Sequence, residues 1–346
     1  MKKNLLIILL LTLFIKPVQA QFGMGKIEEI EAVQGRKLIV MIEEPRERMI
    51  KKLTKKPKRG SVEEYKADLI KYNALMKEVV EKFWPHNKEN ISYKTYEQIE
   101  ALKKSKSKEY AVLCCLSAEP SSYSSGFNFN DGLYWTKSIK LDFEDSDDDM
   151  FTMMVVNTIE DFGRSPVFQT PLFDVFPTKA AIAYGLATTK NYFEMRIRTK
   201  KEGGSMRDER KMVEKKIEEN APRIKDKTLL IRAEWLDEEL TEANFKDHYP
   251  YKYKICDREF MDNVVMTQNS EYAYGVVLPN VMSGSRSNSV FYFQYVFDGK
   301  DGTMMAMVMP SQGSMMAASG ITGKAGKRNF TFKIMEKLLA QINGKK

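Results

Sequence analysis

Histidine is the side chain most often used for proton transfer near neutral pH, and this 346-residue chain has two, His86 and His248. They are 162 residues apart, and Glu97 and Glu259 are separated by the same interval. Two imidazoles and two carboxylates could hold a metal ion such as zinc if the fold brought them together. These four residues are our candidates for binding. The alternative is that each histidine is an ordinary polar turn residue, and we assign neither a catalytic residue nor a metal ligand.

Other patterns that carry chemistry are incomplete in this sequence. It has no Gly-x-Ser-x-Gly elbow and no His-Glu-x-x-His pair. The glycine-rich segment 320–327 lacks the Ser or Thr that follows the lysine of a phosphate-binding loop. The acidic segment 142–149 lacks the glycine and final glutamate of a calcium loop, and the methionines of 304–309 alternate as in a buried strand rather than a copper site. We therefore expect no cofactor.

The first twenty residues have the pattern of a signal peptide. Lys2 and Lys3 precede an apolar run over 5–15, and small residues at Val18 and Ala20 mark a cleavage site. The run is too short to anchor the protein across a bilayer. The mature chain would be 21–346, secreted or periplasmic. Without the three leader lysines its formal charge falls from +8 to +5, which does not indicate a nucleic-acid-binding protein.

Composition indicates a folded chain with room for two domains. Apolar residues make up 43% and charged residues 29%, which excludes the disordered and low-complexity classes. Three cysteines are too few for a disulfide scaffold. Cys114 and Cys115 lie in an apolar run and are expected to pack as small hydrophobic residues, with a disulfide from one of them to Cys256 as the alternative.

Comparison of the chain with itself indicates an internal duplication. The superposed pairs are Phe83 with Phe245, His86 with His248, Glu97 with Glu259 and 109–111 with 271–273, all at an offset of 162; Asp147 with Asp301 and Met153 with Met307 at 154; and 37–41 with 227–231 at 190. The pairs keep the same order in both copies. Shared α/β element types would be the alternative explanation.

Each copy is predicted to be an α/β unit, βαβαβ followed by a β-hairpin and a closing helix, with a mixed sheet covered on both faces. The predicted hairpins pair 138–143 with 150–156 and 290–297 with 303–309. We divide the mature chain into a first repeat (21–200), a charged linker (201–226) and a second repeat (227–346). The element order resembles that of the α/β domains of envelope translocation proteins of the TolB type. The resemblance concerns element order alone and implies no site residues.

The first copy carries 28 extra residues, about 45–72, that extend into a helix over 61–83. Ser61 and Glu64 form a capping box, and apolar residues at alternating three- and four-residue steps form a seam that includes Tyr65. The seam either packs on its own sheet or binds a partner helix. The preceding segment 46–59 has eight bases and one acid. It is either a solvated loop or a docking element for an acidic envelope surface.

Together these features predict an exported, soluble, non-enzymatic binding or assembly protein of the cell envelope, without a transmembrane anchor and without nucleic-acid binding. Its partner would be an envelope protein or a small ligand, held at the loops beyond the sheet strands, at the cleft between the copies or at the Tyr65 seam, with possible peripheral contact to acidic surfaces. The alternative is a metal-dependent or histidine-assisted hydrolase. A hydrolase predicts His86 or His248 beside a carboxylate in a concave pocket.

Overall fold

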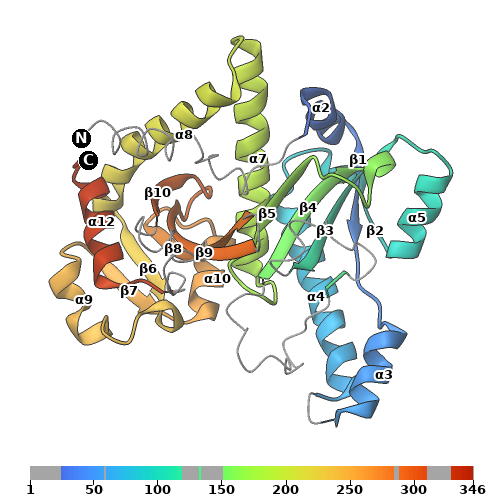
Figure 1. Cartoon of the computed structure of the whole chain (residues 1–346), viewed down its shortest axis with the longest axis horizontal. Helices are drawn as coiled ribbons and strands as arrows, with labels where there is room; N and C mark the ends of the chain where they lie inside the picture. The colour runs from blue at the N-terminus through green and yellow to red at the C-terminus, as the bar shows by residue number, and fades with distance from the viewer. Residues whose placement is uncertain are drawn as a thin grey trace, which may run out of the picture.

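The computed structural model describes residues 25–57, 60–118, 132–133, 151–283, 288–309 and 329–345. The described residues form two five-stranded sheets (Figure 1). The strands of the first sheet are β1 (Lys37–Met41), β2 (Ile91–Lys94), β3 (Tyr110–Ala118), β4 (Phe151–Thr158) and β5 (Phe168–Pro171). Those of the second are β6 (Thr228–Arg232), β7 (Tyr253–Cys256), β8 (Tyr272–Ser283), β9 (Asn288–Asp298) and β10 (Met304–Val308).

The two sheets have the same topology. Their strand orders are β2-β1-β3-β4-β5 and β7-β6-β8-β9-β10. In each sheet the first three strands are parallel and the last two are antiparallel to their neighbours. The predicted fold class, a duplicated α/β unit with mixed sheets, is confirmed.

Helices connect and cover the strands. The helices of the first unit are α2 (Ile27–Gly35), α3 (Glu47–Lys55), α4 (Val62–Phe83), α5 (Tyr96–Lys104) and α7 (Lys179–Lys201). Those that follow are α8 (Met206–Asn220), α9 (Glu242–His248), α10 (Arg258–Met266) and α12 (Phe332–Ile342). Helix α8 occupies most of the segment predicted to be a charged linker and packs against β10. The one extra helix predicted for the first copy, over 61–83, is α4.

The strand register confirms the equivalence of Tyr110 and Tyr272. Tyr110 pairs with Lys37 of β1, and Tyr272 pairs with Thr228 of β6. The same register makes Leu38 equivalent to Leu229, an offset of 191 and not the predicted 190. The predicted alignment of the first strand was therefore wrong by one residue. The error is not trivial, because a slip of one residue exchanges the two faces of a strand.

The predicted alignment at an offset of 154 was also wrong. Residues 138–143 lie outside the described residues, but 151–156 belong to β4, which pairs with β3 and β5. Strand β9 has the corresponding pairing with β8 and β10. Met153 in β4 is therefore not equivalent to Met307 in β10. Both strands are rich in apolar residues, a composition that indicates burial but does not specify the neighbouring strand.

Helix α7 lies between the two units (Figure 1) and packs on α4 of the first and α10 of the second. Its residues 180–186 are all buried, so the helix is covered from both sides. Tyr184 of α7 contacts Phe297 of β9, with 5.0 Å between ring centroids. The buried apolar residues of both units form one continuous cluster. The two copies therefore share a core and do not enclose an open hinge cleft.

Candidate functional site

Helix α3 and the N-terminal half of α4 form a projection that has no counterpart in the second unit. We call residues 46–71 the basic hairpin. Met49 and Leu53 lie on one face of α3, and they pack with Tyr65 and Leu69 of α4 in a small core separate from the main one. The predicted capping box starts α4, with reciprocal 3.0 Å bonds between the Ser61 and Glu64 groups. Figure 1 shows α3 and this half of α4 past the ends of the strands of the first sheet, on the side where the chain leaves β1.

Two sequence predictions about this segment need correction. The segment 46–59 was expected as a loop, but 47–55 form α3, because Met49 and Leu53 are four residues apart and α4 covers them. The seam that includes Tyr65 was considered as a surface for a partner helix. Tyr65 and Leu69 are only 1% and 2% exposed, so α3 already occupies that face. The remainder of the seam packs into the main core.

The base of the basic hairpin is fixed to the carboxyl end of β1 by Glu43. The Asn73 side chain of α4 bonds both the backbone N–H and the backbone C=O of Glu43, at 2.9 and 2.8 Å. The Glu43 carboxylate accepts from Arg46 at 3.0 Å and from the backbone N–H of Leu133 at 3.1 Å. The Arg46 backbone N–H donates to the Tyr65 hydroxyl. These bonds hold the hairpin in one orientation relative to the first sheet.

Glu43 is a buried acid, and burial raises the pKa of its carboxyl above the ordinary value near 4.5 despite the opposing effect of Arg46. The folded protein therefore retains this proton at pH values where the unfolded chain has lost it. As the pH rises from about 4.5 through the folded-state pKa, the Glu43 carboxyl ionises more easily in the unfolded chain than in the folded protein. The folded protein therefore becomes less stable over this pH range.

We expect the wild type to lose stability relative to the Glu43→Gln variant over that pH window. The measurement is the free energy of unfolding in urea, at a series of pH values from acid to neutral. The exposed neighbour Glu44 provides the control, since Glu44→Gln should follow the wild-type curve. Parallel curves for the wild type and Glu43→Gln would contradict the assignment of a raised pKa.

The basic hairpin carries a concentrated positive charge. Residues 46–71 contain ten bases and four acids, a net charge of +6, whereas residues 21–346 total +5. The rest of the predicted mature chain is therefore at −1. Lys55, Lys66 and Lys71 are all exposed. Such segregation produces a local positive field that attracts acidic partners.

The structure places the two histidines in equivalent positions of separate units. His86 follows α4, and its ring meets that of Trp84 edge-on at 5.7 Å. Desolvation is the main cause of the lowered pKa of His86; Glu194 of α7 raises this pKa by less, and Lys190 of α7 lowers it slightly further. His248 ends α9, with its ring 4.2 Å from that of Phe332 in α12. Each histidine thus packs on an aromatic ring of its own unit.

Glu97 and Glu259 also occupy equivalent positions, in the first turns of α5 and α10, and both are exposed. Among the described residues, no hydrogen bond or ion pair joins either histidine to either glutamate. Over the same residues, no group of three or more His, Cys, Asp or Glu side chains is arranged to hold a metal ion.

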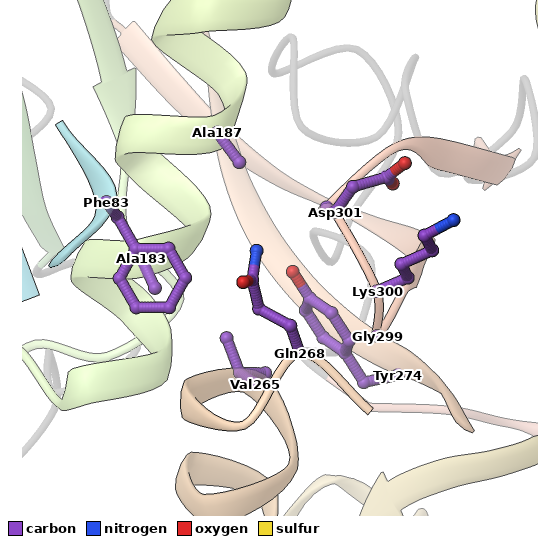
Figure 2. Close-up of a pocket in the computed structure, with 10 residues that line it drawn as sticks. Phe83, Ala183, Ala187, Val265, Gln268, Tyr274, Gly299, Lys300 and Asp301 are labelled. Carbon is purple, nitrogen blue, oxygen red and sulfur yellow. The ribbon is translucent and has the colours of Figure 1, made fainter. Parts of the chain in front are cut away.

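The predicted cleft between the copies is a shallow hollow of about 270 Å³, open mouth included (Figure 2). Phe83 and α7 line one side of it, and Tyr274, Gln268 and the β9–β10 turn line the other. Ligand pockets usually measure about 300–1,000 Å³. The hollow is smaller than that range, and neither histidine lines it.

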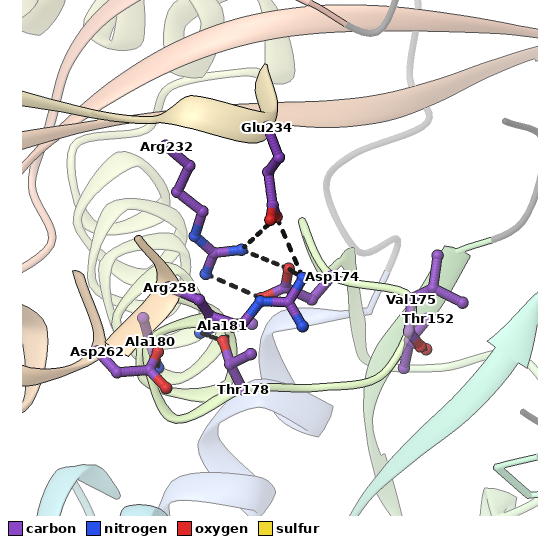
Figure 3. Close-up of polar contacts among 10 residues, drawn as sticks. All are labelled: Thr152, Asp174, Val175, Thr178, Ala180, Ala181, Arg232, Glu234, Arg258 and Asp262. Atoms are coloured by element: carbon purple, nitrogen blue, oxygen red, sulfur yellow. Dashed lines mark hydrogen bonds and ion pairs between the residues drawn. The ribbon is translucent and has the colours of Figure 1, made fainter. Parts of the chain in front are cut away.

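A buried ion pair also joins the units (Figure 3). Nη1 and Nη2 of Arg232 donate to Asp174, at 2.5 and 3.0 Å, and the guanidinium also contacts the rings of Phe173 and Trp235. Arg258 bonds Glu234 at 3.1 Å beside this pair. Sequence reasoning missed Arg232, although an arginine that ends the apolar strand 228–232 is a signal of a buried charge.

All three cysteines are reduced and buried, so the alternative of a disulfide to Cys256 is not what the structure shows. Cys114 and Cys115 lie in β3 of the first sheet, whereas Cys256 ends β7 of the second. Burial raises the pKa of Cys115 to about 12 and that of Cys256 to about 11. Thiols held protonated in this way are poor nucleophiles and metal ligands.

Comparison with known proteins adds no family to this description. No protein-family model matches the chain, and neither does any curated protein or solved structure. Among the residues that the structure describes, none of the helices combines the length and the apolar character needed to cross a membrane.

Proposed function

We propose that this chain is an exported, non-enzymatic binding or assembly protein of the cell envelope, and that it docks on an acidic surface through the basic hairpin. The observation that carries the proposal is the charge distribution: residues 46–71 hold +6, and the remainder of the predicted mature chain holds −1. The leader-like pattern of residues 1–20 supports the location.

The construction of the hairpin supports a docking role. Its small core of Met49, Leu53, Tyr65 and Leu69 is separate from the main core, so the hairpin does little to stabilise the two sheets. Its base is nevertheless held by the Glu43 bonds. A rigid, charged projection of this kind presents bases to a partner at a low cost in conformational entropy on binding.

The position of the histidines also favours binding over hydrolysis. A histidine-assisted hydrolase needs an imidazole beside a carboxylate in a pocket. Here His86 and His248 pack on Trp84 and Phe332 in separate units. The hollow between the units is lined by other residues.

The proposal is tested by expressing the complete chain in a bacterium and separating exported soluble protein from the envelope fraction. We expect the exported form to begin at Gln21 and to sediment with the envelope in dilute buffer. At about 1 M salt, where the Debye length is about 3 Å, it should be released. Retention at high salt, or a protein that remains in the cytoplasm, would refute the proposal.

Charge variants identify the surface responsible. Reversal of three exposed hairpin lysines, Lys55→Glu, Lys66→Glu and Lys71→Glu, should move the protein to the soluble fraction. The matched control reverses three exposed lysines of the second unit, Lys246→Glu, Lys252→Glu and Lys333→Glu, with the same change in net charge. An equal effect of both triple variants would show that the overall charge matters and the hairpin does not.

A further inference from the structure

The acidic surface that the basic hairpin fits is an anionic lipid bilayer. We propose that the hairpin binds phospholipid headgroups directly, with Ile70 entering the interface. This inference rests on the proposed function and specifies its partner. Three observations carry it: the type of base, the arrangement of the bases and the exposure of Ile70.

The bases of the hairpin are mostly lysines. Seven of the ten bases in 46–71 are lysine, and Tyr65, which is buried, is the only aromatic residue there. Protein–protein interfaces are enriched in Tyr, Trp and Arg and depleted in Lys. A lysine-rich surface without exposed aromatic rings fits a diffuse layer of negative charge better than it fits a shaped protein pocket. Anionic lipids also attract segments that carry several lysines close to the membrane surface.

The bases are spread around the projection and do not form one bounded patch. Lys55 lies at the end of α3, while Lys66 and Lys71 lie on α4. A five-residue step of about 100° per residue puts Lys66 and Lys71 on different sides of α4. A specific protein partner would have to surround the hairpin to reach them all. A bilayer surface needs no such complementarity, because its headgroups rearrange around the hairpin.

Ile70 is the apolar part of the surface. It is 70% exposed. Among the described residues, Met309 at the end of the second sheet is the other large hydrophobic residue that is exposed. Lys66 precedes it by four residues and therefore shares its side of α4. The side chain of Ile70 can therefore enter the apolar part of a membrane interface while the Lys66 ammonium group stays among the headgroups.

Vesicle sedimentation with the exported, purified chain tests the inference. We expect binding to phosphatidylcholine vesicles that contain phosphatidylglycerol, and none to phosphatidylcholine alone. Lys55→Glu, Lys66→Glu and Lys71→Glu together should weaken binding by at least about 100-fold, since each base near an anionic surface contributes roughly a fivefold factor in affinity. Ile70→Ser should weaken it roughly tenfold, because it removes an apolar side chain from the interface.

The variant with Lys246→Glu, Lys252→Glu and Lys333→Glu is the control and should bind as the wild type does. Circular dichroism and the thermal midpoint establish that every variant is folded. Equal binding to both vesicle types would overturn the inference. So would a failure to bind phosphatidylglycerol vesicles while the protein still sediments with envelopes in a salt-sensitive way. That second result leaves the proposed function standing and identifies an acidic protein or polymer as the partner, whereas the loss of both interactions refutes both proposals.

Discussion

Replacement of Asp174 by alanine should lower the free energy of unfolding by about 3–5 kcal/mol, because it leaves Arg232 charged and buried without its principal partner. The Arg232 side chain is 0% exposed, so water cannot replace the carboxylate. Glu234 lies 3.5 Å from the guanidinium but is half-exposed, and it can recover only a small part of the loss. The two partners come from different units, so the pair stabilises the junction itself.

Urea denaturation of Asp174→Ala measures this loss. The double variant Asp174→Ala with Arg232→Met should be more stable than Asp174→Ala alone, because an apolar side chain beside Phe173 and Trp235 carries no desolvation cost. Lys179→Ala is the control, since its ion pair with Glu78 is largely exposed and should be worth less than about 1 kcal/mol. Equal losses for Asp174→Ala and Lys179→Ala would contradict the assigned role of the buried pair.

Leu69→Ala should open the basic hairpin and leave the two sheets folded. Truncation of a buried leucine costs about 2–4 kcal/mol, which corresponds to roughly a 30- to 1000-fold rise in the equilibrium constant for opening. The expected opening is local, because Leu69 packs in the small core with Met49, Leu53 and Tyr65 and not in the main core. The C-terminal half of α4 contributes Tyr72, Met76 and Val79 to the main core and should stay in place.

Limited trypsin digestion measures the opening, since the hairpin contains nine potential cleavage sites, Lys56 being excluded because Pro57 follows it. Leu69→Ala should be cut faster within 46–71, while the thermal midpoint of the remaining protein changes little. The matched control is Leu338→Ala in α12, which truncates a fully buried leucine of the main core. It should lower global stability without selective cleavage of the hairpin. Cooperative unfolding of the whole chain by Leu69→Ala would show that the two cores are not independent.

Short-range features of the fold could be predicted from the sequence. The capping box at Ser61 and Glu64 depends on residues three apart, and it is present as predicted. The tyrosines at 110 and 272 begin apolar strands after the same interval from each histidine, and the register makes them equivalent. These features follow from patterns within one element, or from repetition of a whole unit.

The candidate site required the tertiary structure. The net charge of the basic hairpin is a property of the sequence, but its conformation as two helices depends on contacts between α3 and α4. Of the two loops predicted beyond the third strand of each copy, 121–126 and 283–289, the first and residues 284–287 of the second lie outside the described residues, whereas Ser283 and 288–289 belong to the paired strands β8 and β9. The histidines were matched correctly to each other, yet their packing on Trp84 and Phe332 follows from the path of the chain.

The sequence alone determined the type of most elements, their order and the fact that the unit occurs twice, because periodicity, caps and repeats are read within short stretches or by direct comparison. The tertiary structure decided that β4 lies beside β3, that α3 covers the Tyr65 seam and that Asp174 neutralises Arg232. Each of these depends on which surface covers another. An apolar face indicates only that another surface must cover it, and a buried charge indicates only that it needs a partner. The choice among possible neighbours is made by the packing of the whole chain.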